Sequence, residues 1–321
     1  MNLGIIAGII LVLVLAVLRG APEFFYVYVI KRKTPHSINP VSRMTRNRPA
    51  ADEPPPWLTA QSCETADITS HDGLRLRAHY LASKAGSTGN AIAPYTVILA
   101  HGYTGNVLQM SGFARFFYEG LGYNILLPEA RGHGDSEGTY IGMGWHDRLD
   151  YLRWIDWVKQ RTGPALGGVP PRIVLYGISM GAATVLMTGG EALPPEVKAI
   201  IEDCGYTSVE DELYYQMISR YHLKSRWLMN ATSRVARKRA GYSFAEASAL
   251  EQVKKIKVPT LFIHGEEDAF VPFQMVYSLY EACSAPKELF AVPGAGHGGA
   301  YSVAGGEYEE RIRDFLRQWV P

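Results

Sequence analysis

A serine stands between two glycines at the junction of two apolar runs. The segment Gly177-Ile-Ser-Met-Gly181 follows the strand-like run Arg172-Ile-Val-Leu-Tyr176 and precedes the helix-like run Ala182-Ala-Thr-Val-Leu-Met187. This arrangement is typical of a nucleophile elbow, whose sharp turn leaves no room for side chains at the two glycines. We therefore predict that Ser179 is an exposed nucleophile at a helix N-terminus, where backbone N–H groups favour negative charge.

Elbows of this kind are followed along the chain by an acid and then by a histidine. The run Val258-Pro-Thr-Leu-Phe-Ile263 leads to Asp268, and the run Lys287-Glu-Leu-Phe-Ala-Val292 leads to His297. Both candidates therefore follow the carboxyl end of a predicted strand, at the edge of an open α/β sheet where ligands bind. Because a serine hydroxyl needs a base to act as a nucleophile, we predict that His297 takes its proton and that Asp268 orients His297.

The acid has other candidates. Glu266 and Glu267 are neighbours of Asp268, and Asp203 follows another predicted strand, Val197-Lys-Ala-Ile-Ile201. Ser179 and His297 can also be read as ordinary loop residues. We favour Asp268 over these three candidates.

Acyl transfer also requires hydrogen-bond donors for the oxyanion that develops on the substrate. We expect one donor to be the backbone N–H of Met180, the residue after the nucleophile. The second is expected in the loop after the predicted strand Thr96-Val-Ile-Leu-Ala100, at the N–H of Tyr103. His101, in the same loop, is expected to brace the loop rather than to act on the substrate.

Together these segments resemble the α/β-hydrolase superfamily, from about Glu64 to the C-terminus. Within it, the chain is similar to bacterial serine hydrolases with an N-terminal membrane anchor and no assigned substrate, and to the cinnamoyl-esterase and monoacylglycerol-lipase branches. The resemblance implies a mainly parallel, eight-stranded sheet flanked by helices, with a helical lid inserted after the sixth strand. It rests on His101-Gly-Tyr103, Arg131-Gly-His-Gly-Asp-Ser136, Gly177 to Gly181, His264-Gly-x-x-Asp268-x-x-Val-Pro272 and Gly296-His297.

The expected lid lies at about residues 205–251, with helices predicted near Val209–Tyr221 and Ser225–Lys238. This insertion is rich in Tyr, Met and Leu. Some of these side chains are expected to wall an apolar acyl pocket, although packing of the lid on the main domain would require the same residue types. The candidates for the pocket are Tyr214, Met217, Trp227 and Met229.

Residues 1–33 are predicted to form a transmembrane anchor with basic residues beside the membrane. Leu3 to Leu18 contains only Leu, Ile, Val, Ala and Gly, and a second apolar piece, Phe24 to Ile30, precedes Lys31-Arg-Lys33. The first run is a little shorter than the about 20 residues that span a bilayer. A cleaved signal peptide is the alternative, but a basic N-terminal region and a convincing cleavage site are missing. By the positive-inside rule, the hydrolase domain should be cytoplasmic.

Composition bounds the remaining possibilities. The chain has 321 residues, 47% of them hydrophobic, and a net charge of +1, which indicates one large globular domain and no nucleic-acid partner. We place this domain at residues 61–321, after a linker or extended arm at 34–60. The 3 cysteines are too few for a disulfide framework, and no Cys/His spacing indicates a metal site, so no cofactor is expected. The sequence specifies no oligomeric state.

These residues predict a serine esterase that cleaves small-molecule ester or acyl substrates through an acyl-enzyme intermediate. A thioesterase, a peptidase or an acyltransferase would use the same triad, and acidic residues near the start of the insertion, among them Glu202 and Glu212, keep a peptidase open. A non-catalytic, anchored binding protein is the third hypothesis. It is disfavoured because every catalytic role has a candidate.

Overall fold

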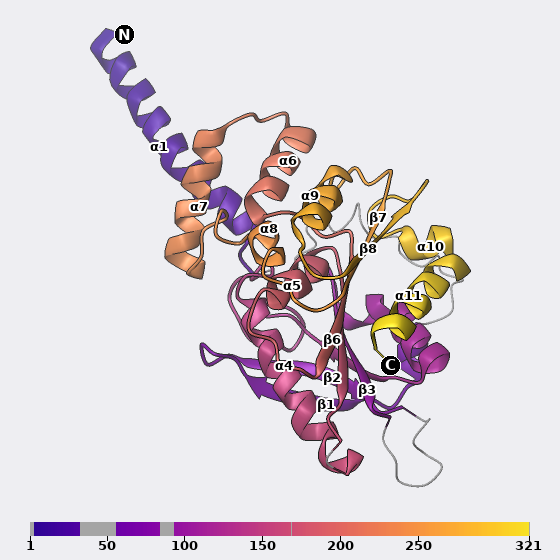
Figure 1. The fold of residues 1–321 in the computed structure, drawn as a ribbon. Helices are drawn as coiled ribbons and strands as arrows, with labels where there is room; N and C mark the ends of the chain where they lie inside the picture. Colours follow the sequence, from indigo (N-terminus) through magenta and orange to yellow (C-terminus); the bar gives the residue numbers. More distant parts are fainter. Residues whose placement is uncertain (1–2, 33–55, 84–92, 168, 321) are drawn as a thin grey trace.

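The computed structural model describes residues 3–32, 56–83, 93–167 and 169–320 (Figure 1). Most of the predicted linker at 34–60 lies outside these residues. The remaining chain folds around one central sheet.

The sheet has eight strands, as predicted, and their order is β1-β2-β4-β3-β5-β6-β7-β8. The first two strands form an antiparallel hairpin, β2 is also antiparallel to β4, and the other neighbours are parallel. The strands are β1 (Glu64–Thr69), β2 (Arg75–Leu81), β3 (Tyr95–Ala100), β4 (Asn124–Pro128), β5 (Arg172–Ile178), β6 (Val197–Asp203), β7 (Thr260–Gly265) and β8 (Lys287–Val292).

Helices cover both faces of the sheet, so the central parallel strands are continuous apolar runs rather than alternating ones. Successive strand residues face opposite sides: Ile98 joins one core and Val97 the other. The first core is covered by α4 (Asp147–Thr162), α5 (Met180–Gly189), α8 (Ala249–Val253) and α9 (Gln274–Ala282). The second is covered by η1 (Trp57–Ala60), η3 (Val107–Met110), α3 (Ser111–Arg115), the π-helical turn η4 (Phe116–Gly120), α10 (Ala300–Ala304) and α11 (Gly306–Trp319).

The chain between β6 and β7 contains the two predicted helices of the insertion, α6 (Val209–Tyr221) and α7 (Arg226–Ala240). Their N-termini are set by serines: the side chain of Ser208 accepts the N–H of Asp211, and that of Ser225 accepts the N–H of Leu228. The helices are therefore placed as the sequence indicates. A lid function for them stays a prediction.

The N-terminal helix α1 (Leu3–Val29) is not separate from the main domain, contrary to expectation. Its C-terminal part packs along α7, as Figure 1 shows, and Tyr26 and the following Ile30 are buried in the main core. The guanidinium of Arg239 on α7 lies 2.7 Å from the carboxylate of Glu23 on α1. This part of α1 belongs to the fold.

The segment after α1 also docks on the main domain. The guanidinium of Arg32, expected beside a membrane, donates to the carbonyl oxygens of Gly134 (2.7 Å) and Ser136 (2.8 Å). In addition, the N–H of Ile141 donates to the carbonyl of Ile30. These contacts fix the end of α1 against the loop that follows β4.

The predicted transmembrane anchor is not supported. Within the described ranges, no helix is both long and apolar enough to cross a membrane. Apolar side chains are required both by a bilayer and by a protein interior, and Tyr26 and Ile30, at the end of the predicted anchor, serve the interior. The cytoplasmic location, which depended on the anchor, stays a prediction.

Candidate active site

The turn between β5 and α5 has the backbone of a nucleophile elbow. Ser179 has φ 56° and ψ −118°, a strained conformation for a residue with a side chain. A Cβ atom at Gly177 would collide with the carbonyl of Gly181, and one at Gly181 would collide with the carbonyl of Ala100. The two glycines are therefore required by the close approach of three backbone segments.

The structure brings Ser179, His297 and Asp268 together from three loops. The Nε2 atom of His297 lies 2.9 Å from the Oγ atom of Ser179, and its Nδ1 atom lies 2.7 Å from the Oδ2 atom of Asp268. With Nδ1–H donating to the carboxylate, Nε2 accepts the serine hydroxyl. This is the geometry that a general base and its orienting acid require.

Asp268 is held by four hydrogen-bond donors. Its Oδ1 atom accepts the N–H groups of Phe270 and Val271, both at 2.9 Å. The Nε2 atom of His264 lies 3.3 Å from Oδ2, beside His297. Burial by itself would raise the pKa of Asp268, but the hydrogen bonds from His264 and His297 outweigh it and lower the pKa to about 2. Asp268 is therefore a fixed negative charge behind His297.

The other acid candidates have different surroundings. The Oδ2 atom of Asp203 accepts the phenol O–H of Tyr308 at 2.8 Å, and burial raises the pKa of Asp203 to about 6. Glu266 and Glu267 are exposed. The geometry therefore favours Asp268.

The loop after β3 runs against the serine, as an oxyanion loop must. A Cβ atom on Gly102 would lie 3.5 Å from the Cβ atom of Ser179. Tyr103 and Met180 line the same cavity as Ser179. The donor roles of their backbone N–H groups stay predictions.

His101 braces this loop. Its Nδ1 atom is 2.9 Å from the carbonyl oxygen of Gly102, and its Nε2 atom accepts the N–H of Ala130 at 3.1 Å. Burial lowers the pKa of His101, which favours the neutral ring that donates on one side and accepts on the other.

Arg131 is an architectural residue of the Arg131–Ser136 segment. Its buried guanidinium pairs with Asp150 (2.7 Å) and Asp72 (2.9 Å). His71, Asp72 and Asp150 also form a group with metal-ligand spacing. Because both carboxylates already bind Arg131, we assign this group to the ion pairs.

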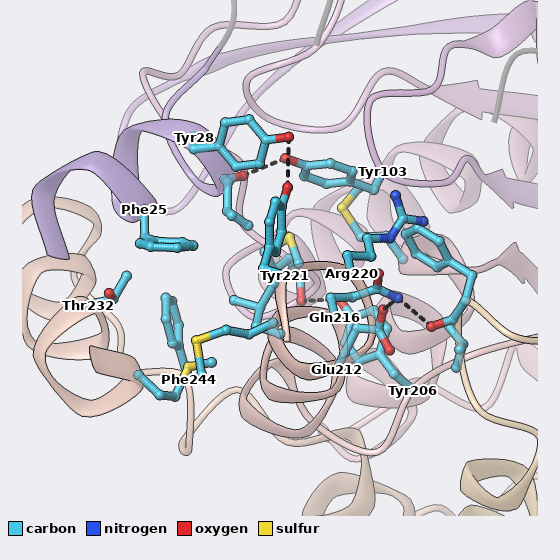
Figure 2. Close-up of a pocket in the computed structure, with 18 of the residues that line it drawn as sticks. Phe25, Tyr28, Tyr103, Tyr206, Glu212, Gln216, Arg220, Tyr221, Thr232 and Phe244 are labelled. Atoms are coloured by element: carbon cyan, nitrogen blue, oxygen red, sulfur yellow. Dashed lines mark hydrogen bonds between the residues drawn. The ribbon is translucent and has the colours of Figure 1, made fainter. Parts of the chain in front are cut away.

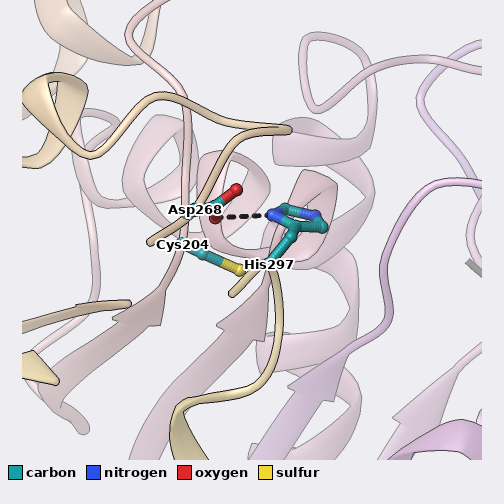
Figure 3. Close-up of side chains that lie close together, drawn as sticks. All are labelled: Cys204, Asp268 and His297. Carbon is teal, nitrogen blue, oxygen red and sulfur yellow. Dashed lines mark hydrogen bonds and ion pairs between the residues drawn. The ribbon is translucent and has the colours of Figure 1, made fainter. Parts of the chain in front are cut away.

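Cys204 lies beside the acid and the histidine, as Figure 3 shows. The Sγ atom of Cys204, a carboxylate oxygen of Asp268 and a ring nitrogen of His297 all lie within 4.8 Å of one another, which is close enough for three ligands of one metal ion. Both ring nitrogens of His297 already have partners, and burial raises the pKa of the Cys204 thiol, which disfavours the thiolate that binds metals. We therefore assign this cluster to the triad rather than to a metal centre.

A cavity opens from Ser179 between α1 and the inserted helices (Figure 2). It contains about 920 Å³ of space, including solvent at its mouth. Besides Ser179, Tyr103 and Met180, its lining includes Phe25, Tyr28, Val29, Met143, Tyr206, Glu212, Leu213, Gln216, Met217, Arg220, Tyr221, Leu228, Met229, Thr232, Phe244, Phe270 and Val271.

Two of the four predicted pocket residues line this cavity, and two do not. Met217 and Met229 do. Trp227 is 49% exposed, because α7 turns Leu228 and Met229 inward and leaves Trp227 outside. The ring of Tyr214 lies under the guanidinium of Arg226, 3.9 Å away, and is also outside the lining.

The aromatic wall supplied by α1 was missed by the sequence analysis. Phe25, Tyr28 and Val29 line the cavity, and the phenol of Tyr103 donates to the carbonyl of Val29 at 2.6 Å. The phenol of Tyr221 on α6 donates to that of Tyr28 at 3.1 Å. Phe25, Tyr28 and Val29 are spaced i, i+3 and i+4, and this spacing was the available signal for one helix face that contacts protein.

Helix α6 contacts the segment after Asp268 directly. The side-chain amide of Gln216 donates to the carbonyl of Phe270 at 2.5 Å, and the phenol of Tyr215 donates to that of Ala269 at 3.1 Å. The ring of Phe270 stacks on His297, with centroids 4.7 Å apart, and the guanidinium of Arg220 lies 4.8 Å from the centre of the Phe270 ring. Thus α6 packs against the triad as well as the cavity.

The fold and the site define a serine hydrolase of the α/β-hydrolase superfamily. Residues 110–321 match the model of the prolyl oligopeptidase family, and the chain belongs to that family. The uncharacterized protein YqkD of Bacillus subtilis (strain 168) is 30% identical over 223 residues, which cover 70% of this chain and 71% of YqkD.

Two solved structures illustrate the likeness of the fold. The esterase Pf2001 of Pyrococcus furiosus has a TM-score of 0.63 and 25% identity, over 81% of this chain and 94% of that one. Est1E of Butyrivibrio proteoclasticus, solved with ferulic acid bound, has a TM-score of 0.60 and 19% identity, over 79% and 99% of the two chains.

Proposed function

We propose that this protein is a carboxylic ester hydrolase that acts through a Ser179–His297–Asp268 triad. His297 removes the proton of Ser179 as the hydroxyl attacks the ester carbonyl, and then protonates the departing alcohol. Water, deprotonated by His297, hydrolyses the acyl-enzyme and releases Ser179. The observation that carries the proposal is the pair of hydrogen bonds at His297, 2.9 Å to the serine and 2.7 Å to the acid.

The surroundings of the serine support an ester with an apolar acyl group. The cavity beside Ser179 is lined largely by aromatic and aliphatic side chains, including Phe25, Leu228 and Phe244. Such surfaces bind hydrocarbon by removing it from water. Pf2001, the structural relative at 25% identity, is an esterase.

A peptidase is the second candidate, because the family model is that of prolyl oligopeptidases. The same triad cleaves either bond, so the leaving group must be tested. The test is a panel of an ester, a thioester and an aminoacyl amide with one common acyl group, assayed with the full-length protein. We expect the highest kcat/KM for the ester; faster cleavage of the amide would establish the peptidase instead.

Substitution of the nucleophile tests the mechanism on the same panel. Ser179→Ala should lower kcat by about 10⁴-fold or more, because the acyl-enzyme cannot form. Ser302→Ala, at an exposed serine on α10, is the matched control and should keep wild-type activity. Ester hydrolysis at the wild-type rate by Ser179→Ala would contradict the mechanism.

A further inference from the structure

One carboxyl group lies in the wall of the otherwise mainly apolar cavity. Glu212, on α6, is only 4% exposed, and it is the sole acidic residue among the described residues that line the cavity. Figure 2 shows it beside Gln216 and Tyr206. A buried carboxyl group has to be hydrogen-bonded to offset its loss of water.

Only one of the two oxygen atoms of this carboxyl group is hydrogen-bonded within the described structure. The Oε1 atom accepts the side-chain amide of Gln216 at 2.9 Å. The Oε2 atom is buried and has no hydrogen-bond partner among the described residues. Leaving such an atom unpaired destabilises the protein, so packing alone does not account for an acid at this position.

The protonation state decides what the Oε2 atom offers. Burial raises the pKa of Glu212 to about 8, although the hydrogen bond from Gln216 lowers it; the Asp268 carboxylate raises it further, and the Arg220 guanidinium lowers it. At neutral pH the group is therefore mostly a neutral carboxylic acid. Since Oε1 already accepts a hydrogen bond, the remaining Oε2–H is a donor.

We propose that Glu212 determines substrate specificity by donating a hydrogen bond from Oε2 to an oxygen atom carried by the acyl group of the ester. The favoured substrates are then esters of acids whose chain bears an ether, keto or hydroxyl oxygen, rather than plain fatty acyl esters. Phe244, Leu228 and Met229 contact the hydrocarbon part of the same chain. This inference rests on the proposed esterase function.

The test uses p-nitrophenyl octanoate and analogues in which an ether oxygen replaces one CH2 group at chain positions 4 to 7. An ether oxygen accepts a hydrogen bond, cannot donate one, and hardly changes the length of the chain. The full-length wild type is compared with Glu212→Leu, which removes the donor, and Glu212→Gln, which keeps an N–H donor. The readout is the ratio of kcat/KM for each ether ester to that for octanoate, because this ratio cancels any loss of folded protein.

We expect the kcat/KM of the wild type for one of the ether esters to exceed that for octanoate by about tenfold, because one hydrogen bond contributes roughly this factor. Glu212→Leu should reduce that ratio to about 1, and Glu212→Gln should retain part of it. Glu210→Gln, which removes a charge on the same helix where Glu210 lies 3.5 Å from Arg226, is the control and should keep the wild-type ratio.

The inference would be overturned if octanoate is hydrolysed but the wild type prefers no ether ester over it. It would also be overturned if Glu212→Leu prefers the same ether ester as strongly as the wild type does. Failure of the wild type to hydrolyse any of the esters would overturn the proposed function, and this inference with it. The two failures are therefore distinguishable in one experiment.

Discussion

Three buried carboxyl groups at the ends of β6 and β7 have pKa values shifted in opposite directions. Burial raises the pKa of Glu202 to about 8 and that of Asp203 to about 6. At Asp268 the hydrogen bonds from two histidines overcome burial and lower the pKa to about 2. Asp268 is thus the carboxylate that stays ionised beside His297, as the stabilisation of an imidazolium requires.

Glu202 should make the stability of the protein depend on pH. Its folded pKa of about 8 lies above the ordinary value of 4.5, so the folded state binds the extra proton, and its contribution to stability is lost as pH rises from 4.5 through 8. Glu202→Gln keeps an oxygen acceptor for the N–H of Gly205 and removes the titration. The free energy of unfolding of the wild type should fall between pH 5 and pH 8, and in Glu202→Gln this fall should be smaller by on the order of 2 kcal/mol.

Urea unfolding at pH 5, 6.5 and 8 measures this effect. Glu281→Gln, at an exposed glutamate on α9, is the matched control and should leave the pH profile of the wild type unchanged. Parallel profiles for the wild type and Glu202→Gln would show that Glu202 is ionised in the folded protein at neutral pH.

At the scale of elements, the site depends on α1 and α6 as well as on the sheet. Helix α1 supplies one wall of the cavity and accepts the phenol of Tyr103 from the oxyanion loop. Helix α6 supplies another wall and binds the carbonyls after Asp268 through Gln216 and Tyr215. A protein that begins after residue 32 would lack one wall, so functional experiments require the full chain.

The wall formed by α1 should influence the length of acyl chain that the enzyme accepts. Phe25 lines the cavity and packs edge-on against Tyr221, with ring centroids 6.4 Å apart. Phe25→Ala removes that wall, and the ratio of kcat/KM for p-nitrophenyl dodecanoate to that for the hexanoate should rise by about tenfold.

Phe24→Ala makes the same chemical change one residue away, at a side chain that is 63% exposed. This control should keep the chain-length profile of the wild type. An identical change in both variants would assign the effect to the stability of α1 rather than to the wall of the cavity.

At the scale of the whole molecule, the sheet and the elbow were predictable because their signals are local. The apolar runs before Ser179, Asp268 and His297 become β5, β7 and β8, and the parallel sheet then brings the three following loops to one edge. Gly177 could be assigned to the turn because its steric crowding against the carbonyl of Gly181 acts within five residues, and Gly181 could be assigned by its place in the same motif, although the carbonyl that crowds it belongs to Ala100. The positions of these residues along the chain were sufficient to predict the sheet and the elbow.

The cavity was less predictable because its walls come from distant segments. The spacing of apolar residues around Phe25 indicates one helix face, but it does not distinguish a face that meets lipid from one that meets another helix, as Phe25 meets Tyr221 on α6. The periodicity of α7 distinguishes Met229 from Trp227 only when the neighbouring helices are in place. The buried position of Glu212 likewise depends on tertiary packing.

The most direct test of the central claim is labelling of the full-length protein with a fluorophosphonate probe, followed by mass mapping of the modified peptide. Such a probe reacts with a serine whose hydroxyl is activated by a base. We predict a single modified residue, Ser179, with labelling slowed by about 100-fold or more in His297→Ala. A folded wild-type protein that is not labelled, or that is labelled at another serine, would contradict the account.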